Sequence, residues 1–217
     1  NLLRSLLISI NDMILTGAHA KIIVIDNDKM GSGKKIIEEF KKISKYEVIY
    51  DIEPEKGISN ARNKALSLVT SKYVAFLDDD EFVSKKWLDI LWKALIIYKA
   101  DVAFGPVIPI CPEELPNWLK NHPYFLRTRM PSGTRVETGG CGNVIFKFES
   151  IGYPYYKFNN KYSLSGGEDT DFFYRVNMDG FIEIWCDEAI VYENILKDRI
   201  CLKWILGRSF RTGQTAI

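Results

Sequence analysis

Histidine is scarce in this sequence, and its cysteines form no recognisable pattern. The 217 residues include two histidines, His19 and His122, which excludes a histidine-rich metal site and leaves few ways to build a Ser-His-Asp or Cys-His catalytic group. The four cysteines lie far apart and form no CxxC pair, so neither a zinc ribbon nor a dense disulfide framework is expected. We therefore expect a protein of a reducing, cytoplasmic compartment.

The chain also lacks a strong overall charge and a long apolar run. Its formal net charge of +1 gives no general attraction to polyanions, and we expect no nucleic-acid partner. No uninterrupted apolar run approaches the ~18 to 20 residues of a membrane-spanning helix. Hydrophobic residues still make up 47% of the chain, which suffices for the core of one domain of ordinary size.

What the sequence does contain is an alternation of helical and strand patterns. Apolar residues at helical spacing predict helices over residues 2–14, 32–44, 59–69 and 87–96. Runs of β-favouring residues predict strands over residues 21–26, 46–52, 73–77 and 101–110. Strands that alternate with helices indicate an α/β protein with a doubly wound, mostly parallel sheet and helices on both faces.

The most informative segment is residues 73–81, where an apolar strand pattern runs into four carboxylates. Like charges this close raise one another's pKa values, and a divalent cation with oxygen ligands relieves the repulsion most simply. The carboxyl end of a strand is also where open α/β sheets bind ligands. The alternative is a solvated acidic turn that caps the next helix. The four acids are Asp78, Asp79, Asp80 and Glu81.

Two further polar clusters occur where a strand ends or a helix begins. Asp26 and Asn27 end the first strand pattern, where they can hydrogen-bond a nucleobase or ribose or simply close the strand with an Asx turn. Asn60, Arg62 and Asn63 crowd the first turn of a helix, a place that attracts anions. Their alternative role is ordinary polar decoration of a helix surface.

A paired carboxylate, Glu168 and Asp169, opens a helical pattern behind two glycines. Acids in a first helical turn suit the helix dipole, so this placement alone does not establish catalysis. Beside a metal-bound phosphate, however, a separate carboxylate can serve as a general base.

Together these segments have a specific order and spacing that resembles the family 2 glycosyltransferases with a GT-A fold. The segments are Val24-Ile25-Asp26-Asn27, Gly57-Ile58-Ser59-Asn60-Ala61-Arg62-Asn63, Phe76-Leu77-Asp78-Asp79-Asp80-Glu81 and Gly167-Glu168-Asp169-Thr170-Asp171-Phe172. The resemblance runs across most of the chain. It implies a nucleotide-sugar donor, with a UDP-sugar expected, at the carboxyl ends of the strands.

The resemblance also implies roles for the acidic residues on the donor side. Residues 78–80 match the DxD-type motif, with Asp80 as the ligand of Mg²⁺ or Mn²⁺ and Asp78 or Asp79 on the ribose or the metal. Many relatives carry a further metal-binding histidine after the last strand, and this sequence has Glu193 there. By the same resemblance, Asp26 and Asn27 lie where the family contacts the base, and Asn60, Arg62 and Asn63 are expected at the donor site.

On the acceptor side, Asp169 matches the base that deprotonates the acceptor hydroxyl, with Glu168 beside it. The acceptor is expected to enter over the proline-rich stretch of residues 112–140. Its aromatic residues Trp118, Tyr124 and Phe125 can stack on a sugar, although packing of the loop is the stronger expectation.

The function implied is metal-dependent, inverting transfer of a sugar from a nucleotide diphosphate to a hydroxyl of a glycan, lipid or polysaccharide, as in cell-envelope polysaccharide synthesis. Two alternatives stay open. A metal-dependent nucleotidyltransferase would also use carboxylates at strand ends. A catalytically impaired nucleotide-sugar-binding remnant is the other, because the resemblance implies a strand before the first helix that this sequence does not contain.

The last part of the chain differs in charge from the rest. We expect a GT-A domain over residues 1–196 and a basic amphipathic helix with a tail over residues 197–217. Five basic residues face one acid between positions 197 and 211: Lys197, Arg199, Lys203, Arg208 and Arg211. Such a helix can lie on an anionic membrane, at the inner face in a cytoplasmic protein, or dock on the catalytic domain through Ile200, Trp204 and Ile205.

Overall fold

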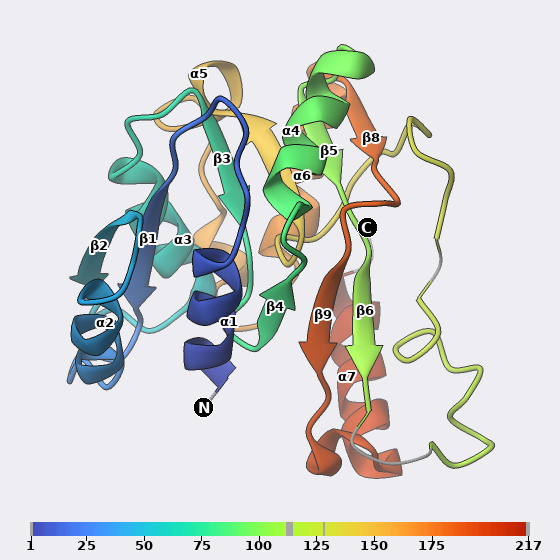
Figure 1. Ribbon diagram of the computed structural model, residues 1–217. Helices are drawn as coiled ribbons and strands as arrows, with labels where there is room; N and C mark the ends of the chain where they lie inside the picture. The colour runs from blue at the N-terminus through green and yellow to red at the C-terminus, as the bar shows by residue number, and fades with distance from the viewer. Residues whose placement is uncertain (1, 112–114, 128, 216–217) are drawn as a thin grey trace.

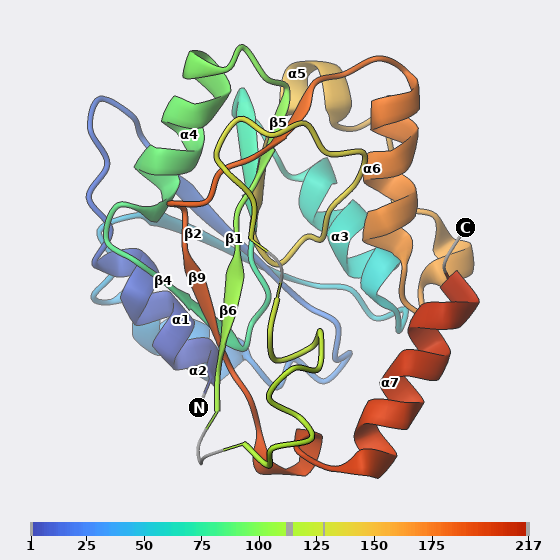
Figure 2. The same cartoon turned by 90° about the vertical axis from the view of Figure 1, so that its right-hand side faces the viewer.

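The computed structural model describes residues 2–111, 115–127 and 129–215 and has a layered α/β architecture. The strands form the middle of the molecule (Figure 1). Figure 2 shows α1 (Leu2–Asn11), α2 (Lys34–Lys41) and α4 (Trp87–Ile97) on one side of them, and α3 (Ile58–Ser67), α6 (Glu168–Met178) and α7 (Leu202–Thr215) on the other. The α/β class and the helices on both faces are therefore confirmed. Shorter helices are α5 (Phe148–Ile151), η1 (Asn160–Tyr162) and η2 (Lys197–Arg199).

The strands form three sheets with mixed pairing. β1 (Lys21–Asp26) and β2 (Glu47–Ile52) pair in parallel. The second sheet has the order β3 (Tyr73–Phe76), β7 (Val144–Lys147), β5 (Val102–Phe104), β8 (Glu183–Trp185), and the third has the order β4 (Glu81–Val83), β9 (Val191–Asn194), β6 (Val107–Ile110). The pairing is more mixed than the sequence predicts, because β7 runs antiparallel to both β3 and β5, and β4 runs antiparallel to β9.

The single strand expected over residues 101–110 is two strands in different sheets. The chain leaves the second sheet at Gly105 and Pro106, and β6 then joins the third sheet beside β9. A side chain at position 105 would not fit, because a Cβ there would lie 2.5 Å from the Ala189 carbonyl oxygen and 2.5 Å from Asn143 Nδ2. Proline at 106 has no N–H to continue the ladder.

An aromatic core fixes the start of α6 against the second sheet. Phe172 and Phe173 of α6 are fully buried and pack on Phe146 of β7 and on Phe158, whose ring stacks on that of Phe172 at 4.4 Å. Each such ring contributes on the order of 1.5–3 kcal/mol through burial. This packing holds the first turn of α6, with its acidic residues, next to the ends of the strands.

The basic C-terminal helix docks on the rest of the protein. Ile205 is buried with Leu119, Tyr124 and Phe125, and Ile200 and Trp204 pack against this group. The expected packing role of Tyr124 and Phe125 is thus confirmed, whereas Trp118 is 56% exposed. None of the described helices is long and apolar enough to cross a membrane. The side chain of Arg211 lies outside the described residues.

Candidate active site

A cleft of about 700 Å³ lies where β3 gives way to the acidic segment. It gathers acidic residues from distant parts of the chain, namely Asp78, Asp79, Asp80, Glu81, Asp169 and Glu193. It is also lined by three arginines, Arg127, Arg199 and Arg208, and by Trp204. The acidic strand end, the expected base and the expected further ligand therefore share one cavity, which a purely solvated acidic turn would not require.

Glu81 lines this cleft and contacts the backbone of the acidic turn. Its side chain is buried, and its Oε2 accepts a hydrogen bond of 2.8 Å from the backbone N–H of Asp78. Burial, reinforced by the charge of Asp78, raises the pKa of Glu81 to about 10. The group is therefore protonated at neutral pH and braces the turn that presents the three aspartates.

Arg62 contacts Asp78 from the protein interior. The guanidinium is buried and donates to Asp78 Oδ1 at 3.2 Å and to Glu168 Oε1. The pKa of Asp78 is raised by partial removal from water inside the cleft, where the side chain is still 48% exposed, and Arg62 acts in the opposite direction. The same partial desolvation raises the pKa of Asp79, and the charge of Asp80 adds to that effect. Arg62 therefore contacts the acid Asp78 from the protein interior, and donor binding by Arg62 stays a prediction.

The two acids that open α6 point to different surroundings. Gly167 precedes them with φ 92°, a left-handed conformation that favours glycine. Glu168 turns inward to Arg62, and its Oε2 has no hydrogen-bond partner among the described residues. Asp169 lines the cleft, where its Oδ1 accepts from the Thr170 N–H at 2.8 Å and its Oδ2 from the Cys141 N–H at 3.4 Å.

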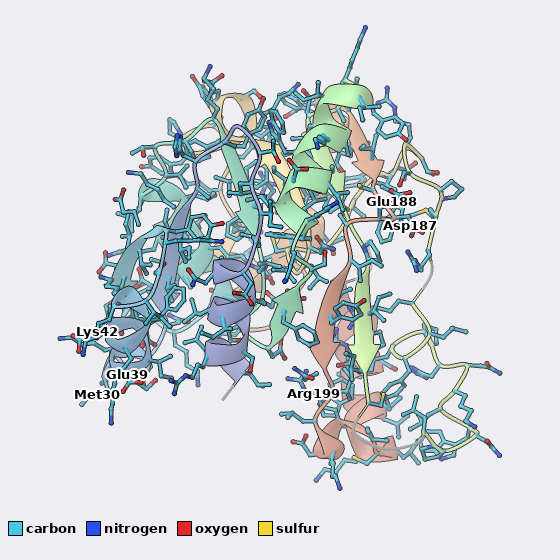
Figure 3. All side chains as sticks on the ribbon, in the orientation of Figure 1. Met30, Glu39, Lys42, Asp187, Glu188 and Arg199 are labelled. Atoms are coloured by element: carbon cyan, nitrogen blue, oxygen red, sulfur yellow. The ribbon has the colours of Figure 1, made fainter. Side chains whose placement is uncertain are left out.

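Asp80 and Glu193 are joined by one arginine. Arg199 donates from Nη2 to Asp80 Oδ2 and from Nη1 to Glu193 Oε1, each at 3.1 Å. Glu193 also accepts from the Tyr124 hydroxyl at 3.1 Å and from Arg127. Figure 3 shows Arg199 at the end of β9, where the chain turns toward α7.

Besides Arg62, four of the predicted donor-site residues lie outside the lining of the cleft, and their side chains contact other parts of the protein. Asp26 accepts from the N–H groups of Asp28 and Gly33, and from the Tyr50 hydroxyl at 2.8 Å. Asn27 donates to the carbonyls of Glu53 and Glu55 and accepts from the Gly57 N–H. The Asx turn at Asp26, which the sequence left open as an alternative, is therefore present.

The two asparagines of α3 also contact backbone. Asn63 donates to the Phe158 carbonyl at 2.9 Å and accepts from the Phe158 N–H at 2.8 Å, which ties α3 to the loop before α6. Asn60 makes one long contact of 3.5 Å to the Glu55 carbonyl. Donor binding by Asp26, Asn27, Asn60 and Asn63 stays a prediction.

Comparison with known proteins identifies the family. A family model described as "Glycosyl transferase family 2" matches residues 1–158, which is more than half of the chain. The chain belongs to glycosyl transferase family 2. The GT-A-like fold agrees with this, since the structure of S. aureus TarS 1-349 superposes with a TM-score of 0.68 at 15% sequence identity, covering 89% of this chain and 57% of that one.

Two bacterial proteins are similar to parts of this chain. The succinoglycan biosynthesis protein ExoM of Rhizobium meliloti (strain 1021) is 31% identical over 198 residues, 91% of this chain and 64% of ExoM. Glycosyltransferase GlyA of Streptococcus pneumoniae serotype 4 is 30% identical over 96 residues, 43% of this chain and 14% of GlyA. This family 2 chain therefore spans less than two thirds of the length of ExoM.

The cleft of this family 2 protein suits a divalent cation in its chemistry. Among the described residues, no three His, Cys, Asp or Glu side chains form a ready metal-binding group. Asp78, Asp79 and Asp80 nevertheless offer the carboxylate oxygens that Mg²⁺ and Mn²⁺ prefer. A bound cation would also stabilise the charged form of Asp79, whose pKa is raised in its absence. These donors fit the cation, while the Glu193 carboxylate is already held by three other donors.

Reasoning from the sequence missed the arginines of this family 2 cleft. The sequence places Arg199 and Arg208 in a basic helix that lies on a membrane or docks on the catalytic domain, and it gives no signal for Arg127. In the structure all three line the cleft, and the Arg208 guanidinium lies 4.7 Å from the centre of the Tyr124 ring. The excess of basic residues after position 196 was the available signal. It identified a cationic surface but not the carboxylates that this surface faces.

Proposed function

We propose that this chain transfers a sugar from a nucleotide diphosphate, a UDP-sugar, to a hydroxyl of an acceptor. The observation that carries the proposal is that Asp80, after β3, and Asp169, at the start of α6, line the same cleft. Structures of S. aureus TarS 1-349 in complex with UDP and with UDP-GlcNAc support a uridine nucleotide. The names of ExoM and of the Bacillus subtilis relative TuaG, a putative teichuronic acid biosynthesis glycosyltransferase, support an acceptor on the way to a polysaccharide.

The reaction we propose is a single displacement with inversion at the anomeric carbon. The hydroxyl oxygen of the acceptor forms a bond to the anomeric carbon while Asp169 accepts the hydroxyl proton. The bond between the anomeric carbon and the donor diphosphate breaks in the same step. The backbone N–H groups of Thr170 and Cys141 hold the carboxylate of Asp169 in the cleft. Glu168, turned inward to Arg62, positions the first turn of α6 and takes no proton from the acceptor.

The cofactor we propose is Mg²⁺ or Mn²⁺, held by Asp80 with Asp78 or Asp79. When bound, the cation supplies positive charge that offsets the charge of the departing diphosphate. The buried Arg62 holds Asp78, and the neutral Glu81 braces the backbone of the same turn. Both contacts keep the aspartates in place before a donor arrives, so that less reorganisation is needed during the reaction.

Two substitutions test the assignment of these roles. Asp80→Ala should abolish both transfer and cation-dependent UDP binding, whereas Asp169→Asn should retain UDP binding and lose turnover by about 10² to 10⁴. Asp12→Asn, at an exposed position just after α1 and outside the lining of the cleft, is the matched control and should behave as the parent protein does. Turnover of Asp169→Asn above about a tenth of the parent value would contradict the base assignment. Transfer of the nucleotidyl group instead of the sugar would replace the proposed reaction altogether.

A membrane contact through residues 197–211 is a separate part of the proposal. Ile200, Trp204 and Ile205 pack inward, but Leu202, Leu206 and Phe210 form an exposed stripe along α7 at positions i, i+4 and i+8. Lys203 is exposed on the same helix. Anionic vesicles should therefore sediment more protein than neutral vesicles at low salt, and equal sedimentation would remove the membrane contact from the proposal.

A further inference from the structure

Arg199 occupies a central place among the cleft carboxylates. Its two terminal nitrogens reach Asp80 Oδ2 and Glu193 Oε1, both at 3.1 Å, and so connect the segment after β3 with the last strand of the third sheet. The arginine side chain is 25% exposed, and those of Asp80 and Glu193 are 18% and 10% exposed. This bridge is therefore part of the cleft wall and not a contact of the open surface.

The Asp80 carboxylate in this bridge is also the one that the proposed divalent cation would use. A carboxylate oxygen that accepts from a guanidinium at hydrogen-bond distance is a poorer metal ligand, because the two cations repel and compete for the same lone pairs. Glu193 would still be held by Tyr124 and Arg127 after Arg199 had left it. Asp80, by contrast, forms its ion pair with Arg199.

We propose that Arg199 is a positioning residue that competes with the divalent cation for Asp80 and thereby sets the affinity of the cleft for that cation. The inference rests on the proposed function, since it takes Asp80 as a cation ligand. Arg199 holds the two carboxylates together while the cleft is empty and must release Asp80 when the cation binds. Fewer competing cations and more free carboxylates both strengthen the binding of a divalent ion.

Titration with Mn²⁺ alone, followed by electron paramagnetic resonance, tests this without any substrate. Arg199→Gln should bind Mn²⁺ about tenfold more tightly than the parent protein, because one competing charge is removed and the Asp80 carboxylate is freed. Arg199→Lys should lie between the two, since a single ammonium group keeps the charge but lacks the planar fork that bridges two carboxylates. The matched control is Arg129→Gln, whose arginine pairs with Asp187 at the opposite end of β9 (Figure 3), and it should bind Mn²⁺ as the parent does.

The outcomes separate this inference from the proposed function. A purely structural role for Arg199 predicts unchanged or weaker Mn²⁺ binding in Arg199→Gln, and that result would overturn the inference while the parent protein still bound Mn²⁺. If neither protein binds Mn²⁺, both the inference and the proposed cofactor are wrong, and the Asp169→Asn assay still decides the sugar transfer. If Arg199→Gln does not fold by circular dichroism, Arg199→Lys decides, because affinity no tighter than that of the parent would refute the competition.

Discussion

Glu183 makes the stability of this protein depend on pH in a way that can be measured. The residue begins β8 with 0% exposure, and neither side-chain oxygen has a hydrogen-bond partner among the described residues. Burial raises the pKa of Glu183 from its ordinary value of 4.5 to about 9. Between these two values the folded protein keeps a proton that the unfolded chain releases. Rising pH therefore favours the unfolded chain by about 1.4 kcal/mol per pH unit, or about 3 kcal/mol by neutral pH.

Glu183→Gln removes this proton while keeping the size of the side chain. The free energy of unfolding of the variant, relative to that of the parent protein, should rise by about 1.4 kcal/mol per pH unit from about pH 5 to about pH 8. Urea denaturation of both proteins at several pH values measures this slope. Other buried acids contribute equally to both proteins, so their effect cancels in the difference. Glu137→Gln, at an exposed position, is the control and should show no such slope. A difference between Glu183→Gln and the parent that stays constant with pH would refute a protonated, buried Glu183.

Further substitutions and one chelation experiment probe the cleft. Gly142→Ala should weaken UDP binding, measured by calorimetry, because a Cβ there would lie 2.5 Å from Glu81 Oε1. Gly207→Ala is the control and should leave the affinity for UDP unchanged, because no atom lies within 4 Å of the new Cβ. Arg62→Met should lower the free energy of unfolding by about 3 kcal/mol in urea, because it leaves the carboxylate of Glu168 buried without its partner, and a loss below about 1 kcal/mol would contradict that role. Removing divalent cations with EDTA should lower turnover, and re-adding Mn²⁺ should restore it, whereas unchanged turnover in EDTA would argue for metal-independent transfer.

The elements that could be predicted from the sequence are those with a clear local pattern. The strand over residues 21–26 matches β1, and the apolar face of residues 87–96 matches α4, where Trp87, Leu91 and Leu95 are buried. Both elements could be predicted from local sequence, because the periodicity of their apolar residues indicates which side chains face the core. β7 and β8 have four and three residues, too few for periodicity to distinguish them from loops. Their position beside β5 depends on contacts that local sequence does not encode.

The residues of the candidate site likewise include some that local sequence predicts and others whose positions depend on distant contacts. Asp78, Asp79, Asp80 and Asp169 could be placed because each lies beside a strand end or a helix start. The inward turn of Glu168 and the reach of Arg199 to Asp80 could not, since each depends on a partner more than 100 residues away. An asparagine offers a ligand and a loop backbone the same amide group. Its residue type alone could not show that Asn63 is held by Phe158.

The spacing of the cleft contacts along the chain has a consequence for biosynthesis. Arg62 and Glu168 are 106 residues apart, and Asp80 and Arg199 are 119 residues apart. Closing such long loops is slow, and none can close before its second partner has been translated. Until residue 199 has been synthesised, the acids after β3 lie in a pocket that lacks Arg199 and the part of the wall that it forms. Formation of the Asp80–Arg199 contact during refolding should therefore lag behind recovery of the helical signal.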